Sequence, residues 1–356
     1  MLTLDEKKIR KRKPIGLPYQ GSKKKISKKI VEIIKQNFGT EKPIYDIFGG
    51  GGAITAECLI NGLSVHYNDL DETITEMFKK VILSDREYLK TLIIRREEFF
   101  KTRDKQEKSV DDNLKLLVNS FGNNKIGYLY SEEFADIKYN LAIEIIKNHD
   151  TFSGYKKTET YIKNLQKYKE QPDHKRQFKN IEQLQRLQQL QQLQQLQRLE
   201  KLKVTNLDYK AFSNVENAIL YLDPPYEGAA GYDGTKGARQ VSPDVYKKIR
   251  QKLLKMPAGS VIVEDAFEYK IGTSSNNQNR MYVKDLQSRD NRFNSQSFYN
   301  WAYEMSKKNI VLISSYEISD SRFEWVYEFK KAKSTLAAQG YGKKTEKLFM
   351  VKKGVK

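Results

Sequence analysis

The stretch Asp46-Ile47-Phe48-Gly49-Gly50-Gly51-Gly52 decides the fold class, because it places a glycine-rich turn directly after an apolar segment. The segment 42–48 predicts a short strand, and the apolar spacing of 53–61 predicts a helix. A second strand is expected over 63–67, ending at Asn68-Asp69. A strand, glycine turn, helix, strand and acidic residue, in that order, form the first half of a nucleotide-binding Rossmann-like sheet. The sequence therefore predicts an α/β fold.

The turn itself allows two interpretations. Glycines after a strand let the backbone approach a ligand closely, but they also form tight turns that bind nothing. The Gly-Lys-Ser/Thr ending of a P-loop is missing, which disfavours nucleoside triphosphate binding. Asp69 follows Gly52 by seventeen residues, where an acid commonly binds the ribose hydroxyls of a nucleoside cofactor. Alternatively, Asn68-Asp69 caps a helix over 72–83.

The middle of the chain has a different character. Residues 85–202 are rich in lysine and tyrosine, and their pattern is mostly helical. Strands are expected again over 204–207 and 218–222, and buried strands over 260–264 and 309–314. Residues 228–295 are rich in Gly, Ser, Asn and Arg and predict loops over the site.

A leucine–glutamine repeat closes this middle region. Over 183–202 a leucine recurs at every third position from Leu184 to Leu202. Because a helix turns about 100° per residue, a three-residue period drifts by about 60° per repeat, so the leucines wind around the helix. This spacing excludes a heptad coiled coil. A helix buried all round, a tight three-residue coil and a partly disordered spacer remain open, and an expanded repeat with no direct chemical role is the alternative to any function.

The strongest chemical signal is Asp223-Pro224-Pro225-Tyr226, directly after the apolar strand 218–222. The two prolines fix φ and cannot continue a sheet ladder, so the chain turns away rigidly. A carboxylate, free carbonyls and an aromatic ring are thereby presented at the carboxyl end of a strand, where α/β sheets bind ligands. The set suits an amino group on a planar base, since the oxygens accept its hydrogens while the ring stacks. A purely structural turn is the alternative.

Composition limits the partners. The formal net charge is +19, and residues 1–35 hold twelve Lys or Arg against three acidic residues, opening with the basic run 7–13. That excess suits a polyanion such as DNA or RNA, or an acidic membrane surface, although a solvated lysine-rich surface explains it equally well. No segment is apolar and long enough to span a bilayer, and no signal-peptide core is present. Cys58 is the single cysteine, and three scattered histidines make a structural zinc site improbable. We therefore expect an intracellular, metal-independent protein.

Together these segments resemble the Dam family of DNA adenine-N6 methyltransferases, especially its phage-type members. The family order is Tyr/Trp-x-Gly-x-Lys, Asp-x-Phe-x-Gly-x-Gly, Asn-Asp, an inserted recognition region and Asp-Pro-Pro-Tyr. Here the corresponding pieces are Tyr19 to Lys23, Asp46 to Gly52, Asn68-Asp69, residues 85–202 and Asp223 to Tyr226. Taken alone, the first of these would be only a helix start with Ser22 as its cap. Residues 228–292 depart from the family pattern, which puts the contacts over the target base in doubt.

The resemblance implies a Rossmann-like domain that depends on S-adenosyl-L-methionine, formed by residues 1–84 and 203–356. Residues 85–202 would be an inserted, mainly helical DNA-recognition domain. The enzyme would transfer a methyl group to the N6 amino group of a flipped adenine in double-stranded DNA, in the cytoplasm of a bacterial or phage-infected cell. The residues implied to bind the cofactor are Tyr19, Lys23, Asp46, Phe48, Gly50, Gly52, Asp69, Asp223 and, on a looser match, Asp208.

For the target base, the resemblance implies that Asp223 and the Pro224 carbonyl hold the amino group and that Tyr226 stacks on adenine, with Pro225 completing the turn. Candidate DNA contacts within the insertion are Asn123, Asn124, Tyr128 and Tyr130. Asn pairs bidentately with adenine edges, and Tyr fills a vacated stack. Ordinary surface and core roles are the alternative. Rival activities are methylation of RNA adenine or of cytosine N4, and a catalytically dead DNA-binding decoy; Asp223 favours adenine over cytosine.

Overall fold

The computed structural model describes residues 1–11, 13–18, 22–169, 180–198, 202–226, 243–257, 259–264, 267–273, 279–285, 293–333, 345–352 and 354. The chain divides into two compact units. Unit 1 comprises Met1–Asp223, Tyr303–Tyr316 and Arg322–Lys356, and unit 2 comprises Pro224–Ala302 and Glu317–Ser321.

Unit 1 is built on a seven-stranded sheet with the order β3-β2-β1-β4-β8-β10-β9. Its strands are β1 (Ile44–Asp46), β2 (Val65–Asn68), β3 (Leu202–Thr205), β4 (Ile219–Leu222), β8 (Ile310–Ser315), β9 (Phe323–Lys333) and β10 (Thr345–Val351). The first four and β8 run parallel, whereas β10 is antiparallel to both neighbours. The α/β prediction is confirmed. The antiparallel pair β9–β10 was not foreseen.

The chain leaves β1 toward β2 and β3 on one side and returns to β4 on the other side. Strand order therefore reverses at β1, and open α/β sheets bind their ligands at the carboxyl ends of strands beside such a reversal. Asp46 ends β1, and Asp223 follows β4 directly. The two aspartates thus belong to the strands on either side of this point.

The helices of unit 1 follow the expected pattern, and α2 and α3 match their expected ranges to within a residue. They are η1 (Glu6–Lys8), η2 (Lys23–Lys25), α1 (Ser27–Phe38), α2 (Ala53–Ile60), α3 (Glu72–Leu83), α4 (Arg86–Lys90), α5 (Arg96–Arg103), α6 (Val110–Asn119), η3 (Phe121–Asn123), α7 (Glu132–His149), η4 (Tyr155–Lys157), α8 (Glu159–Lys169), α9 (Glu182–Gln194), η6 (Gln195–Arg198) and η7 (Tyr209–Phe212). Within the described part of 85–198, helices are the regular elements, as expected.

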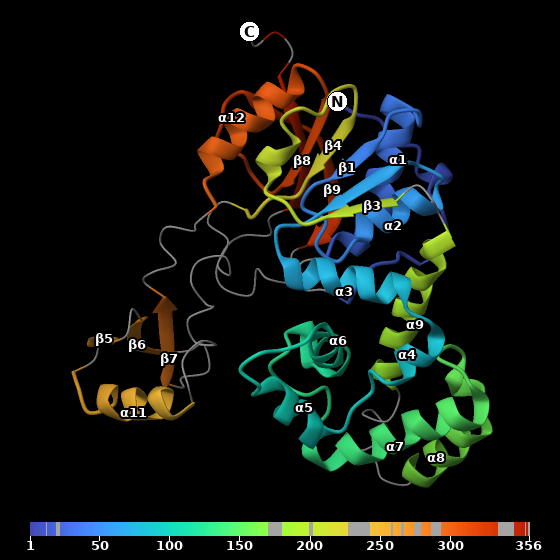
Figure 1. Cartoon of the computed structure of the whole chain (residues 1–356), viewed down its shortest axis with the longest axis vertical. Helices are drawn as coiled ribbons and strands as arrows, with labels where there is room; N and C mark the ends of the chain where they lie inside the picture. The colour runs from blue at the N-terminus through green and yellow to red at the C-terminus, as the bar shows by residue number, and fades with distance from the viewer. Residues whose placement is uncertain are drawn as a thin grey trace. The chain divides into compact units, whose positions relative to one another are not determined.

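Figure 1 shows α5 to α8 grouped together, with α9 leading from this group back to β3. Helix α3 contacts both α6 and α9, and one hydrophobic cluster runs from the sheet into the helical region. The helices within residues 85–198 therefore share a hydrophobic core with the sheet.

The leucine–glutamine repeat forms α9 and then the 3₁₀ helix η6. Leu184, Leu187, Leu190, Leu193 and Leu196 are all buried, and nearly every residue between them is at least half-buried. A 3₁₀ helix has three residues per turn, so the change to η6 keeps Leu196 on the side of Leu193. The described part of the repeat is thus a helix buried almost all round that ends in a three-residue coil.

Unit 2 corrects the expectation of loops over 228–295. Its described residues include α11 (Pro243–Leu253) and a three-stranded antiparallel sheet of β5 (Val261–Glu264), β6 (Phe267–Thr273) and β7 (Asn279–Asp285). The strand expected over 260–264 exists, but Val261 and Val263 are exposed, so the expected burial is wrong. Among the described side chains, the sheet buries Tyr269 and Met281 against α11, and the core there is small. The unit boundary falls within α12 (Ser295–Ser306).

Candidate active site

A salt bridge joins the amino-terminal segment to the residue after β4. Lys23 Nζ lies 2.9 Å from Asp223 Oδ1 and 3.6 Å from Glu346 Oε1, and all three side chains are mostly buried. Ser314 donates a hydrogen bond of 2.7 Å to Glu346 Oε1. Burial alone would lower the pKa of Lys23, but the charges of Asp223 and Glu346 outweigh it and raise the pKa above its usual value. Lys23 is therefore a cation held between two carboxylates.

Glu346 is not among the site residues that the sequence predicts. It lies on β10, which runs antiparallel to β8, so the start of β10 meets the carboxyl end of β8. No local pattern around Glu346 indicates this neighbourhood. The pairing of Lys347 with Ser315 is what brings the Glu346 side chain to the end of the sheet where Lys23 and Asp223 lie.

Two aromatic rings leave no room for side chains at Gly49 and Gly52 of the turn. Tyr67 and Phe78 stack with ring centroids 4.4 Å apart. A Cβ on Gly49 would lie 2.4 Å from Tyr67, and one on Gly52, whose φ is +69°, would lie 2.2 Å from Phe78. The Tyr67 hydroxyl donates 2.8 Å to the Gly50 carbonyl. Any side chain at Gly49 or Gly52 would therefore displace these buried rings or the backbone of the turn.

Asp69 connects the end of β2 with that turn. Its Oδ2 accepts from the Gly50 amide at 2.7 Å, and its Oδ1 accepts from the Asp71 amide at 2.8 Å. The residue that caps α3 is Asp71, which accepts from the Thr73 amide. Helix capping by Asp69, the alternative considered for this residue, is thus excluded. Asp69 is partly exposed, and burial raises the pKa of its carboxyl.

Asp46 is fully enclosed. One of its oxygens accepts from both the amide (3.1 Å) and the hydroxyl (2.7 Å) of Thr55, which ties β1 to α2. Burial raises the pKa of Asp46 to about 7, and the nearby charges of Asp223 and Asp69 act in the same direction. Its carboxyl supports the turn from behind.

An aromatic pair lies beside the turn. Phe48 stacks on Tyr209, with centroids 6.1 Å apart and planes inclined by 29°. Asp208 caps η7 by accepting from the Lys210 amide at 2.9 Å, and it is exposed. Tyr209 is a further residue that the sequence did not single out, and the neighbouring Asp208 was the only signal.

The contacts described above do not place the four remaining candidates. Pro224, Pro225 and Tyr226 belong to unit 2, although Asp223 belongs to unit 1. Tyr19 lies outside the described residues.

The four DNA-contact candidates lie on and beside the turn between α6 and α7. Tyr128 and Tyr130 are buried, at 6% and 8% exposure. The Tyr128 hydroxyl donates to the Ile94 carbonyl at 2.9 Å, and the Tyr130 hydroxyl accepts from the Glu182 amide at 2.9 Å. In this structure both rings therefore serve the core of the helical region.

The tip of this turn is different. Gly122, Asn123 and Lys125 all have φ near +60°, and the Asn123 side-chain oxygen is buried with no partner among the described residues. The side chain of Asn124 accepts from the Ile126 amide at 2.8 Å. Phe121 is 66% exposed. An exposed Phe on a turn with three left-handed residues is a feature that the sequence candidates missed.

A buried arginine from the leucine–glutamine repeat holds this turn. Arg186 donates to the carbonyls of Leu117, Val118 and Ser120 at 2.7–3.0 Å. These carbonyls lie at the end of α6, where a cation also interacts favourably with the helix dipole. Arg186 therefore fixes the point from which the turn departs.

Not every cation of the basic run at the amino terminus is free to bind a polyanion. Arg10 forms a two-point contact with Glu57, with Nη2 2.8 Å from Oε2, and Glu57 is buried. Lys28 donates to the Arg10 carbonyl at 2.9 Å. Arg10 is thus a structural residue rather than a member of a free cationic arm.

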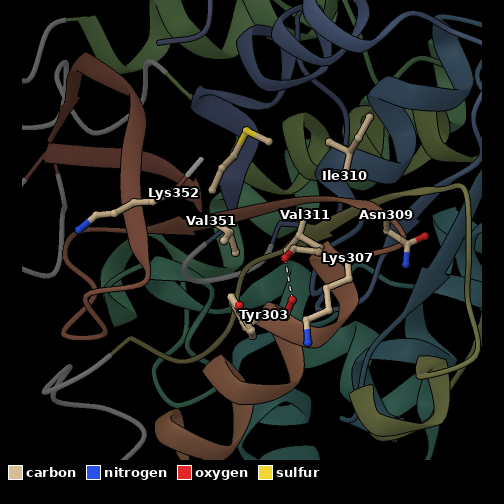
Figure 2. A pocket seen from close by; sticks show the side chains of 9 residues that line it. Tyr303, Lys307, Asn309, Ile310, Val311, Val351 and Lys352 are labelled. Carbon is tan, nitrogen blue, oxygen red and sulfur yellow. Dashed lines mark hydrogen bonds between the residues drawn. The ribbon is translucent and has the colours of Figure 1, made fainter. Parts of the chain in front are cut away.

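A pocket of about 420 Å³ lies at the other ends of the strands, where β8 begins and β10 ends (Figure 2). It is lined by Tyr303, Ser306, Lys307, Asn309, Ile310, Val311, Met350, Val351 and Lys352. Because the parallel strands carry Asp46 and Asp223 at their other ends, this pocket is separate from the site described above. Within the described ranges, no group of three or more His, Cys, Asp or Glu side chains could hold a metal ion. The described helices are all too short or too polar to cross a membrane.

A mostly parallel sheet whose order reverses at β1, with a glycine turn and acids at the carboxyl ends of its strands, is typical of α/β proteins that bind a nucleotide cofactor there. Residues 19–239 match the model of the D12 class N6 adenine-specific DNA methyltransferase family. No curated protein matches the chain. The match covers well over half of the 356 residues, so the chain belongs to this family. It is an enzyme that methylates adenine N6 in DNA and depends on S-adenosyl-L-methionine. The resemblance to the Dam family is thereby confirmed.

Proposed function

We propose that the chain methylates the N6 amino group of a sequence-specific adenine that has left the duplex. The observation that carries this proposal is the position of Asp223, which follows β4 beside the strand reversal and is paired with a buried cation. A paired adenine buries its amino group in the stack, so the base must be extruded to reach such a carboxylate.

The cofactor's expected binding residues fit its chemistry. S-adenosyl-L-methionine supplies an electrophilic methyl group on a positively charged sulfur. The carboxylates of Asp46, Asp69 and Asp223 lie close enough to influence one another's charge, and such an acidic edge favours a cation. Asp69 has one face toward solvent and can accept from ribose hydroxyls, while the glycine turn keeps side chains out of the backbone's way. Lys23, Phe48, Gly50, Gly52 and Asp208 complete the set that we propose, with Tyr19 adjoining it in sequence.

Asp223 would accept a hydrogen bond from the target amino group, and the Pro224 carbonyl would accept a second one. These two bonds would orient the nitrogen, whose lone pair is delocalised in a free base. Lys23 favours the ionised form of Asp223, since an opposite charge within about 4 Å stabilises a carboxylate. Tyr226, three residues on, would stack on the base, with Pro225 fixing the turn. Catalysis would then consist mainly of positioning.

Glu346 would act as a positioning residue in this scheme. Lys23 contacts Asp223 at 2.9 Å and Glu346 at 3.6 Å, so a small movement of the ammonium group exchanges its closer partner. When the adenine amino group arrives, Lys23 can shift toward Glu346 and leave Asp223 Oδ1 to accept from the base. The Ser314 hydroxyl holds Glu346 in place for this exchange.

Recognition of the DNA site we assign to the helical region, residues 85–202, and within it to the turn 121–127. Strained backbone that is held rigidly by its surroundings clusters at functional sites. The left-handed backbone of Asn123 and Lys125, the buried oxygen of Asn123 with no partner among the described residues, and the exposed Phe121 support this assignment. Asn124 shapes the turn. Tyr128 and Tyr130 would support this turn from the core of the helical region.

A DNA substrate also bears on location. We propose that the enzyme acts in the cytoplasm of a bacterial or phage-infected bacterial cell.

Extrusion of the base is testable with a duplex that carries 2-aminopurine at the target adenine, once the methylated motif has been read by sequencing. Fluorescence of 2-aminopurine rises when the base is unstacked, so binding should raise it strongly at the target and not at a neighbouring adenine. Equal, low fluorescence at both positions would contradict extrusion. Phe121→Ala should weaken DNA binding by about 1–3 kcal/mol if the ring stacks with bases. Leu83→Ala, an exposed apolar residue outside this turn, is the matched control.

A further inference from the structure

Helix α11 presents a row of cations that no role described above uses. It packs on one face of the sheet of unit 2, where Ile249 and Leu253 lie with Tyr269 and Met281. The family match ends at residue 239, so this helix and its sheet lie beyond it.

The opposite side of α11 carries exposed lysines. Lys247, Lys248 and Lys252 are all exposed. At about 100° per residue they fall within an arc of about 140°, and Ile249 and Leu253 lie outside it. The helix is therefore amphipathic, with an apolar side on the sheet and a basic side facing away from it.

The described side chains provide these lysines with no neutralising partner of the kind that surface lysines have in unit 1. Among the side chains that the structure describes, which do not include that of Asp244 one turn earlier, no carboxylate lies within ion-pair distance of Lys247, Lys248 or Lys252. By contrast, Lys79, Lys90 and Lys307 each contact a carboxylate three residues earlier at 2.7–2.8 Å. A run of unneutralised ammonium groups repels itself, and this repulsion is relieved when a polyanion binds.

We propose that the basic side of α11 binds the phosphate backbone of the DNA substrate without reading its sequence. Charge complementarity selects the partner: the enzyme acts on DNA, which carries one negative charge about every 1.7 Å along its axis. Lysine is a point charge with three rotatable donors and suits phosphate oxygens better than base edges. Unit 2 thereby adds a DNA contact beyond the residues of the family match.

The test compares two double variants of equal charge change in the full-length enzyme. Lys247→Gln/Lys248→Gln removes two cations from α11. Lys307→Gln/Lys308→Gln removes two exposed lysines near the end of α12 that are paired with Glu304 and Glu216. Fluorescence anisotropy measures the affinity for a duplex with the target site over a series of NaCl concentrations, and circular dichroism confirms that both variants are folded.

Each lost phosphate contact should reduce the slope of log affinity against log salt by about 0.9. Between 50 and 200 mM salt, wild type and the Lys307/Lys308 control should then lose about tenfold more affinity than the Lys247/Lys248 variant. KM for DNA should rise in the α11 variant, and the methylated motif should stay the same. A slope equal to that of the control would overturn the proposal and leave a solvated face or a protein partner. A changed motif would overturn it too, since the helix would then read bases. The proposal rests on DNA as substrate; methyl transfer at saturating DNA reports that separately.

Discussion

Lys23 Nζ lies 2.9 Å from Asp223 Oδ1, although 200 residues separate the two in the chain. The pair joins the first motif of the sequence to the last one. The buried ammonium group of Lys23 thus lies against the carboxylate that we propose as the acceptor for the target amino group. Lys23, first considered a cofactor contact, therefore also bears on the charge of Asp223.

Replacing Lys23 tests this relationship. Without the cation, the ionised form of Asp223 is less favourable, so Lys23→Met should move the acid side of the pH–rate profile for kcat to higher pH. Lys23→Arg keeps the charge and should restore much of the profile. A Lys23→Met enzyme with an unshifted acid limb would mean that the lysine does not act through Asp223.

A second prediction concerns Glu346. Glu346→Gln leaves Lys23 with Asp223 as its one charged partner in the network described above, so the lysine should compete with the adenine amino group. We expect kcat to fall about tenfold, which corresponds to about 1.4 kcal/mol, with KM for the cofactor little changed. Glu346→Asp should recover part of the rate. A drop in thermal stability with kcat intact would reduce Glu346 to a structural residue.

Asp46 predicts a dependence of stability on pH. Its folded-state pKa is about 7, against an ordinary 3.8, so the folded state binds the proton more tightly than the unfolded chain. This contribution is complete below about pH 4 and is lost as pH rises toward 7, amounting to on the order of 4 kcal/mol. Asp46→Asn can still accept from Thr55 and carries no charge. Chemical denaturation without cofactor should show wild type losing stability relative to Asp46→Asn between pH 4 and 7, and parallel curves would contradict the burial argument.

Asp69 and Asp71 form a matched pair for testing cofactor binding. If Asp69 accepts from the ribose, Asp69→Ala should weaken S-adenosyl-L-methionine binding by about 1.5–3 kcal/mol. Asp71→Ala removes the cap of α3 and should lower stability by about 1 kcal/mol while leaving affinity nearly unchanged. Calorimetry that finds the same affinity for Asp69→Ala and wild type would limit Asp69 to holding Gly50 and Asp71.

The sequence was most informative where structure is local. The order of β1, glycine turn, α2, β2 and α3 follows from apolar spacing and glycine alone, and it is confirmed within one or two residues at most boundaries. The sequence did not decide the structure of the leucine–glutamine repeat, because a three-residue period does not define one face of a helix. Its burial depends on the walls that α3, α4 and α6 provide.

Long-range pairing explains what the sequence missed. Glu346 reaches the site only because β10 reverses beside β8, and nothing near residue 346 indicates that reversal. The sheet of unit 2 was taken for loops because its strands bury one face against a single helix. From the sequence, Tyr128 and Tyr130 are candidate DNA contacts, yet in the structure their hydroxyls bond to distant partners, Ile94 and Glu182 on α9.

Transfer of labelled methyl groups to DNA by wild type and Asp223→Ala, followed by nucleoside analysis of the product, tests the central claim most directly. Wild type should yield N6-methyladenine. Asp223→Ala should lose at least about 100-fold in rate, because removing a preorganised electrostatic partner typically costs that much, while its fold and DNA affinity persist. Near-normal transfer by Asp223→Ala would contradict the proposed mechanism, and methylcytosine in the wild-type product would contradict the substrate.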